Sequence, residues 1–188
     1  MAMHRRRWCS LLVLAGAVLA GSRAAAQPPR PVQPVEAVDL DRYAGRWYEV
    51  ARYPNTFQRD CTRDVVASYA LRPDGRVDVR NTCVTDNGAI EAVGVARRAD
   101  PRGPSSVLEV RFAPAVLSFL PAVWGDYWIL DLAPDYSTAV VGDPTRTYLW
   151  LLSRTPLVDG PTYARLIDAV RRQGFDVDRL VRTPQTVP

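Results

Sequence analysis

The sequence predicts an all-β protein: an eight-stranded antiparallel up-and-down β-barrel with one C-terminal α-helix packed on the barrel wall. Two observations predict this fold. Eight short segments alternate apolar and polar residues between turn residues, and one segment near the C-terminus has helical spacing. The length of 188 residues fits a single domain. A β-sandwich would show the same alternation, so strand spacing alone leaves that alternative open.

Turn residues separate the expected strands. In the hairpin between Asp64–Leu71 and the segment that starts at Val77, Pro73 fixes φ and Gly75 accepts a positive φ. The remaining expected strands are Arg46–Tyr53, the alternating residues Val77, Val79 and Asn81, then Ala89–Ala99, Ser106–Phe112, Gly125–Leu132, Ser137–Val141 and Thr147–Ser153.

A single helix follows these strands. Its apolar residues recur at helical spacing and form one stripe: Tyr163, Leu166, Ile167 and Val170. Gly174 ends the helix, and Phe175–Val181 is expected to form a last short strand. Before the first long strand, Asp39–Tyr43 is expected to form one helical turn with Asp39 as its cap.

The N-terminal residues 1–26 have the pattern of a secretory signal peptide. Arg5–Arg7 form the charged region, Leu11–Ala20 the apolar region, and Ala24–Ala26 a small-residue cleavage site. The apolar run is shorter than the roughly 20 residues that span a bilayer. Cys9 precedes the apolar run, where it cannot accept a lipid. We therefore expect export to the periplasm as a soluble protein cleaved near Ala26, with outer-membrane association or secretion left open.

Residues 27–38 contain four prolines and are expected to form an extended linker, followed by the folded domain at 39–184. The formal net charge of +4 comes from the signal segment, because residues 27–188 contain 20 arginines and 20 acidic residues. Nucleic-acid binding needs a concentrated basic surface, so a nucleic-acid partner is not expected.

Cleavage of the signal segment would also limit the catalytic mechanisms that the remaining residues can support. His4 is the only histidine, and the sequence contains no lysine. Ser-His-Asp and Cys-His mechanisms, lysine Schiff bases and the usual zinc sites are therefore excluded, and we expect no metal and no cofactor. The functions that remain are catalysis by carboxylate groups and ligand binding without catalysis.

Three motifs then point to a family. Asp39–Arg52 contains Gly45-Arg46-Trp47-Tyr48-Glu49-Val50, Tyr148–Pro156 contains Arg154, and Pro134-Asp135-Tyr136 lies between them. Together they resemble the motifs of the lipocalins, most closely the branch of bacterial lipocalins and apolipoprotein D, although Pro134 replaces the threonine of the middle motif. The resemblance implies a ligand-binding barrel whose ligand is a fatty acid or a lysophospholipid, with a role in the bacterial cell envelope.

Because successive loops of such a barrel alternate between its two ends, the three motifs fall at the same end. A guanidinium over Trp47 would close that end through a cation–π contact. We therefore assign a structural role to Gly45, Trp47, Asp135, Tyr136 and Arg154. The alternative is an unrelated core tryptophan and surface arginine.

The other end is the expected mouth, formed by Tyr53–Arg63, Thr82–Ala89, Pro114–Trp124 and Gly142–Arg146. Cys61 and Cys83 both fall there, and in an oxidising compartment they are expected to form a disulfide, with two unpaired thiols as the alternative.

The candidate ligand-binding residues follow from alternation and from the apolar segment 114–124. The inward candidates are Tyr69, Val79, Phe112, Trp128 and Trp150, of which Trp128 matches an aromatic position in the apolipoprotein D cavity. Phe119 and Trp124 belong to 114–124, which forms either an apolar rim that gates a lipid or touches a membrane, or a core segment folded over the mouth. The candidates for binding a carboxylate or phosphate are Arg59, Arg63 and Arg146.

These observations predict an exported protein, without catalytic activity, that reversibly carries or stores a hydrophobic ligand. One alternative is an isomerase or epoxide-type enzyme of the same fold, which would need Glu49, Asp131 or a tyrosine inside the barrel. Another is a protein-interaction module that uses segment 114–124 and has a filled barrel.

Overall fold

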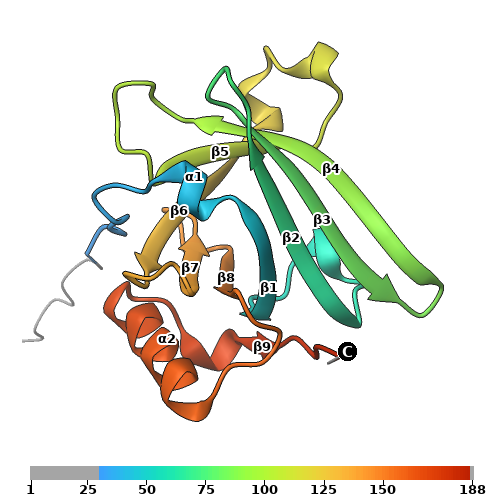
Figure 1. The fold of residues 1–188 in the computed structure, drawn as a ribbon, viewed down its shortest axis with the longest axis vertical. Helices are drawn as coiled ribbons and strands as arrows, with labels where there is room; N and C mark the ends of the chain where they lie inside the picture. Colours follow the sequence, from blue (N-terminus) through green and yellow to red (C-terminus); the bar gives the residue numbers. More distant parts are fainter. Residues whose placement is uncertain (1–29, 187–188) are drawn as a thin grey trace, which may run out of the picture.

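The computed structural model describes residues 30–186, and they form one closed antiparallel barrel (Figure 1). Each strand pairs with the next, and β1 lies between β8 and β2, so a single sheet closes on itself. This confirms the barrel and excludes the sandwich. The barrel strands are β1 (Gly45–Arg52), β2 (Arg63–Leu71), β3 (Val77–Thr85), β4 (Gly88–Arg98), β5 (Val107–Arg111), β6 (Gly125–Leu132), β7 (Thr138–Gly142) and β8 (Leu149–Ser153).

The helix α2 (Gly160–Arg172) packs on the outside of the barrel, as predicted (Figure 1). The Asp159 carboxylate accepts a hydrogen bond of 2.8 Å from the Thr162 N–H and caps the first turn. Leu166, Ala169 and Val170 are buried in one cluster with strand residues such as Val140 and Leu149. The amphipathic stripe therefore covers the outer face of the barrel around β7 and β8.

The segment after α2 differs from the predicted strand over Phe175–Val181. Val177–Arg179 forms a 3₁₀ turn, and only Val181–Arg182 (β9) pairs with β1. The following residues lie between β1 and β2: the Gln185 side chain donates to the carbonyls of Glu49 and Val65, at 2.9 and 3.0 Å. The tail therefore fills the gap where these two strands diverge toward the mouth.

Residues 30–38 form no regular secondary structure, but they are not a free linker. Val32 and Val38 are buried against the barrel. The Val35 N–H donates to the carbonyl of Ile129 at 2.9 Å, and the Val38 N–H donates to Ser105 Oγ at 2.7 Å. Proline prevents a helix here, whereas the valines between the prolines supply the apolar surface that fixes the segment. The predicted signal segment 1–26 lies outside the described residues.

One end of the barrel is closed by the predicted motif residues. Trp47 is fully buried, and the Arg154 guanidinium lies 3.9 Å from the centre of its ring. Arg154 Nη2 and Nη1 donate to the carbonyls of Arg42 and Arg46, at 2.7 and 2.9 Å. Gly45 has φ +94°, and a Cβ there would lie 3.3 Å from Arg154 Nη1, which explains the glycine. The short helix α1 (Leu40–Tyr43) lies across this end.

The residues of the middle motif lie at the same closed end of the barrel. The Tyr136 hydroxyl accepts a hydrogen bond of 3.0 Å from the Asp39 N–H, and its ring lies under the Arg42 guanidinium. Asp135 accepts two hydrogen bonds from Ser137 in the turn between β6 and β7. Within residues 30–186, no helix has the length and apolar content needed to cross a membrane.

Candidate ligand-binding cavity

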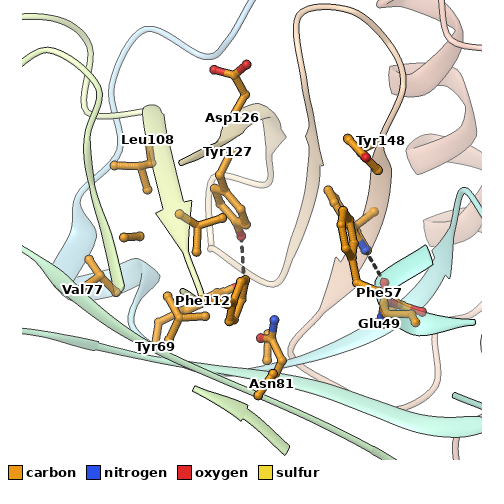
Figure 2. A pocket seen from close by; sticks show the side chains of 18 of the residues that line it. Glu49, Phe57, Tyr69, Val77, Asn81, Leu108, Phe112, Asp126, Tyr127 and Tyr148 are labelled. Carbon is orange, nitrogen blue, oxygen red and sulfur yellow. Dashed lines mark hydrogen bonds between the residues drawn. The ribbon is translucent and has the colours of Figure 1, made fainter. Parts of the chain in front are cut away.

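The barrel encloses a cavity of about 770 Å³ that extends from the plugged end to the mouth (Figure 2). Ligand sites of this kind typically measure about 300–1,000 Å³. Most lining side chains are apolar or aromatic. In the described part of the chain, no arginine lines this cavity. The charged residues of the lining are all acidic: Glu49, Glu91, Asp126 and Asp143.

Five of the seven candidate ligand residues line this cavity: Tyr69, Val79, Phe112, Trp124 and Trp150. Tyr69 and Val79 are directly paired neighbours on β2 and β3. Phe112 lies against Gly94 of β4, where a Cβ would come within 2.7 Å of the phenyl ring. The Phe112 ring can therefore lie against the cavity wall only because residue 94 has no side chain.

The inward orientation predicted for Trp128 is wrong. Trp128 packs on the outer cluster beneath α2, and its neighbour Tyr127 points into the cavity (Figure 2). Tyr127–Leu130 is apolar throughout, because this part of β6 has the barrel interior on one side and α2 with residues 30–38 on the other. Hydrophobicity therefore does not identify the inner face of this strand.

Phe119 does not line the cavity either. It is 75% exposed in the segment between β5 and β6, which contains two 3₁₀ turns, Ala115–Leu117 and Pro121–Val123. Trp124 anchors this segment: its Nε1 donates to the carbonyl of Ser118 at 2.9 Å, and its ring stacks under the Arg97 guanidinium. Segment 114–124 is thus an exposed rim and not a core segment folded over the mouth.

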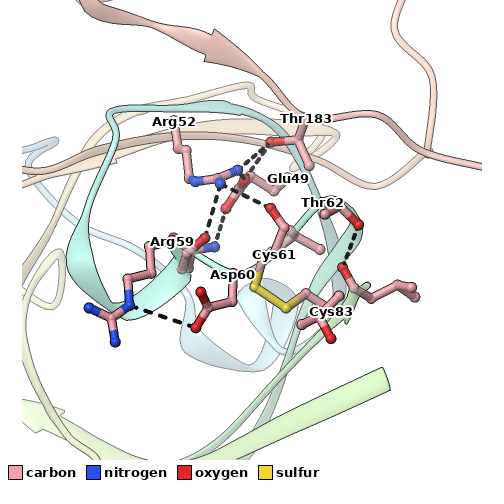
Figure 3. The surroundings of a disulfide bond; sticks show 12 residues. Glu49, Arg52, Arg59, Asp60, Cys61, Thr62, Cys83 and Thr183 are labelled. Carbon is pink, nitrogen blue, oxygen red and sulfur yellow. Dashed lines mark hydrogen bonds and ion pairs between the residues drawn. A yellow bond between two sulfur atoms is a disulfide. The ribbon is translucent and has the colours of Figure 1, made fainter. Parts of the chain in front are cut away.

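The predicted disulfide joins Cys61 to Cys83 at the mouth, with Cα atoms 5.7 Å apart (Figure 3). Beside it, the 3₁₀ turn Thr56–Gln58 places the Gln58 amide against the wall. Gln58 Nε2 donates to Glu49 at 2.7 Å, and Gln58 Oε1 accepts from Trp150 Nε1 at 2.9 Å. The disulfide therefore fixes a loop whose amide links two lining residues.

The buried Glu49 carboxylate is fully engaged in this network. Arg52 Nη1 lies 2.9 Å from one carboxylate oxygen, and the Thr183 hydroxyl donates to the same oxygen (Figure 3). The other oxygen accepts from Gln58. Asp131, the other carboxylate considered for catalysis, pairs instead with Arg165 and Arg172 on α2, outside the cavity.

None of the three arginines proposed for the headgroup lines the cavity. Arg59 pairs with Asp60, and Arg63 pairs with Asp64. Arg146 turns away from the mouth, because it donates to the carbonyl of Gln173 at 2.8 Å and so caps the C-terminal end of α2. The prediction that Arg146 faces a ligand is therefore wrong.

The closed end of the cavity contains three tyrosines. The Tyr127 hydroxyl lies 2.9 Å from the Tyr43 hydroxyl and 2.9 Å from the Tyr69 hydroxyl. Burial raises the pKa of Tyr69 to about 12 and raises the pKa values of Tyr43 and Tyr127 well above the ordinary value. All three phenols are therefore protonated at neutral pH.

The sequence interpretation found only Tyr69 of these three. Tyr43 lies in a helical turn outside the strands, and an inward Trp128 implies by alternation that Tyr127 faces outward. The sequence predicts only Trp150 of the aromatic ladder that it forms with Phe57 and Tyr148 at the mouth. Phe57 comes from a turn without an alternation to follow, whereas Tyr148 belongs to the expected strand Thr147–Ser153. Tyr148 lies two residues before Trp150, and this spacing along a strand is the signal that puts both side chains on the same face.

A closed barrel with one plugged end and one apolar internal cavity defines a class of protein, the β-barrels that hold a small ligand inside. The family model described as a Lipocalin-like domain matches residues 38–185. The chain belongs to the lipocalin family.

Relatives on the branch that the motifs resemble support this membership. Temperature-induced lipocalin-1 of Arabidopsis thaliana is 40% identical over 160 residues, which cover 84% of each chain. Outer membrane lipoprotein Blc of Escherichia coli (strain K12) is 34% identical over 158 residues, 84% of this chain and 85% of the relative. Apolipoprotein D of Mus musculus is 31% identical over 168 residues, 84% of this chain and 82% of the relative.

The fold is shared with more distant solved structures. Apocrustacyanin C1 superimposes with a TM-score of 0.62 at 18% identity, covering 79% of this chain and 81% of that chain. Insecticyanin from the tobacco hornworm superimposes with a TM-score of 0.61 at 18% identity, covering 82% of this chain and 85% of that chain.

Proposed function

We propose that the protein reversibly carries or stores a fatty acid or a lysophospholipid in the bacterial cell envelope. The observation that carries this proposal is the apolar cavity of about 770 Å³, plugged at one end by Trp47 and Arg154 and open at the other. Each buried CH₂ group of an acyl chain contributes about 0.8 kcal/mol, so long chains are bound more tightly than short ones.

The charged group of the ligand stays at the mouth. Among the described residues the cavity lining contains no arginine that would pair with a carboxylate or phosphate, whereas solvent and the exposed Arg59 are available at the rim. This arrangement supports entry of the acyl chain first, along the wall formed by Phe112, Trp124 and Trp150.

Export through the signal segment 1–26 would bring the chain to the oxidising periplasm, where the Cys61–Cys83 disulfide is stable. A relative named as an outer membrane lipoprotein supports the envelope as the compartment. The chain itself is proposed to be soluble after cleavage near Ala26, because the expected lipid acceptor cysteine is missing from the end of its signal segment.

Segment 114–124 is proposed to touch the membrane from which the lipid is taken. Val116 and Phe119 are the most exposed large apolar side chains of the described residues, and both lie on this rim. Phe119→Asp is expected to slow transfer of a fluorescent fatty acid from vesicles while leaving the affinity for the free fatty acid unchanged, because Phe119 lies outside the cavity lining. Equal transfer rates for the variant and the wild type would exclude this contact.

Binding without catalysis is favoured over an enzyme of the same fold. Within residues 30–186, two buried carboxylates line the cavity, and both are already engaged. Both oxygens of Glu49 accept hydrogen bonds, from Arg52, Thr183 and Gln58. Asp143 accepts hydrogen bonds from Thr145 and from the Tyr148 N–H. The interaction-module alternative needs a filled barrel, and the cavity argues against it.

Native mass spectrometry of protein purified from the periplasm without detergent tests the proposed function. A bound species that lipid extraction identifies as a fatty acid or a lysophospholipid is the expected result. An empty protein that also fails to bind added lysophospholipid and fatty acid would remove the carrier function.

A further inference from the structure

The closed end of the cavity contains a cluster of three hydroxyl groups. The hydroxyls of Tyr43 from α1, Tyr69 from β2 and Tyr127 from β6 meet there, with Tyr127 in the middle at 2.9 Å from each of the others. All three side chains line the cavity. Their rings are also packed on one another, with centroid distances of 5.8 Å between Tyr43 and Tyr69 and 6.0 Å between Tyr69 and Tyr127.

Counting hydrogens shows that this cluster has an unused donor. Each phenol carries one O–H hydrogen, so the cluster has three. The two contacts through Tyr127 use two of them, whichever hydroxyl donates in each contact. Within residues 30–186 no other protein atom is hydrogen-bonded to these hydroxyls, so one O–H hydrogen is left over in every arrangement.

Resting on the proposed lipid-binding function, we propose that Tyr43, Tyr69 and Tyr127 form a recognition site for a neutral hydrogen-bond acceptor at the buried end of the ligand. The ligand class is a lipid whose chain carries a ketone, ester or ether oxygen near its leading end. The leftover O–H donates to that oxygen, and the apolar wall holds the rest of the chain.

The lack of a cation in the cavity lining, among the described residues, explains why the acceptor is neutral. The lining contains acidic residues and, among the described residues, no arginine that would balance a carboxylate. Arg154 is separated from the cavity by the rings of Trp47 and Tyr43. A plain hydrocarbon end would expel water and leave the O–H unpaired, which has a cost equivalent to roughly tenfold in affinity. A carbonyl end pairs with the O–H and brings no charge into the cavity.

The test compares saturated fatty acids with their derivatives that carry a ketone next to the terminal methyl, over a range of chain lengths. The measured quantity is the ratio of the two dissociation constants. In the triple variant Tyr43→Phe, Tyr69→Phe and Tyr127→Phe, this ratio is expected to shift about tenfold against the ketone, because no hydroxyl remains. Tyr69→Phe alone leaves two hydroxyls, one contact and again one spare hydrogen, so it keeps the wild-type ratio.

Tyr148→Phe is the matched control, because it removes a hydroxyl from the same cavity lining at the mouth and leaves the cluster intact. The carbonyl stretch of the bound ketone gives a second readout on the wild-type protein, independent of how well the triple variant folds. It is expected at a lower frequency than in an alkane solvent, as for a hydrogen-bonded carbonyl.

The outcomes separate this inference from the proposed function. If fatty acids bind but the ratio is the same in the triple variant, or the carbonyl stretch matches the alkane value, the tyrosine site is wrong and the carrier function stands. If the wild type binds neither fatty acid nor ketone, the carrier function fails, and the tyrosine site fails with it.

Discussion

Arg154 stabilises the closed end of the barrel through two kinds of contact. Its guanidinium stacks on Trp47, and it donates hydrogen bonds to carbonyls contributed by α1, by the start of β1 and by the turn at Tyr136. Burial lowers the pKa of Arg154, but the ordinary value for arginine is so high that the side chain keeps its charge. One side chain thus links three segments that are far apart in the sequence.

Arg154→Ala is expected to lower the free energy of unfolding by roughly 2–3 kcal/mol, because it removes the cation–π contact and leaves carbonyls without donors. Urea denaturation measures this change. Arg76→Ala is the control, since Arg76 pairs with Asp74 at the exposed β2–β3 turn, where ion pairs contribute less than about 1 kcal/mol. Equal losses in the two variants would contradict the role given to Arg154.

Asp135 makes stability depend on pH. Hydrogen bonds from the Ser137 side chain and backbone N–H lower the pKa of Asp135. A carboxyl whose pKa is lower in the folded state stabilises the fold above its unfolded pKa, and this contribution is lost as pH falls through the folded pKa. Asp135→Asn keeps an acceptor oxygen but does not titrate.

The free energy of unfolding of the wild type relative to Asp135→Asn is therefore expected to be largest at neutral pH and to decrease below about pH 4. Urea denaturation of both proteins over this range gives the difference. A difference that stays constant with pH would exclude the Asp135–Ser137 contact as its source.

At the scale of elements, the sequence predicted the strands better than the direction of their side chains. Turn residues such as Gly75 mark where the strands end, and alternation gives the inner face where one side of a strand meets solvent, as for Tyr69 and Val79. β6 is covered on both faces, so the prediction for Trp128 failed. Tyr43, Phe57 and Gln58 reach the cavity from turns, and the positions of turns depend on tertiary contacts that no local pattern records.

The Cys61–Cys83 disulfide fixes the turn Thr56–Gln58 at the mouth. Replacing both cysteines with serine is expected to lower the free energy of unfolding by roughly 3 kcal/mol, because the unfolded chain is no longer constrained. Fatty-acid affinity should fall as well, since Gln58 then loses its fixed position between Glu49 and Trp150. Denaturation and ligand titration of the double variant measure the two effects, and unchanged values for both would contradict the role of the disulfide.

Gly94 admits the Phe112 ring to the cavity wall. Gly94→Ala would place a Cβ 2.7 Å from both the Arg111 carbonyl oxygen and the Phe112 ring, so we expect a loss of roughly 1–3 kcal/mol in stability. Gly160→Ala is the control, because nothing lies within 4 Å of a Cβ there. Thermal denaturation compares the two, and an unchanged melting temperature for Gly94→Ala would show that the wall can move.

The molecule as a whole is a barrel with one closed end and one open end, the mouth. Residues 30–38, α2 and the tail cover the outside, the Arg154–Trp47 contact closes one end, and apolar side chains surround the other. An interior that is closed on all sides but one is the property a carrier needs, because the ligand leaves water without becoming trapped. We therefore expect the ligand to lie inside the barrel.

Two neighbouring residues on β4 allow this position of the ligand to be tested directly. Ala92 lines the cavity, whereas Val93 is 58% exposed on the outer face. The measurement is a titration of Ala92→Trp and Val93→Trp with a long-chain fatty acid, with thermal denaturation to verify that both fold. We expect Ala92→Trp to lose affinity by at least about tenfold, because the indole occupies space that the acyl chain needs. Val93→Trp should bind as the wild type does, and equal affinities for the two variants would contradict a ligand inside the barrel.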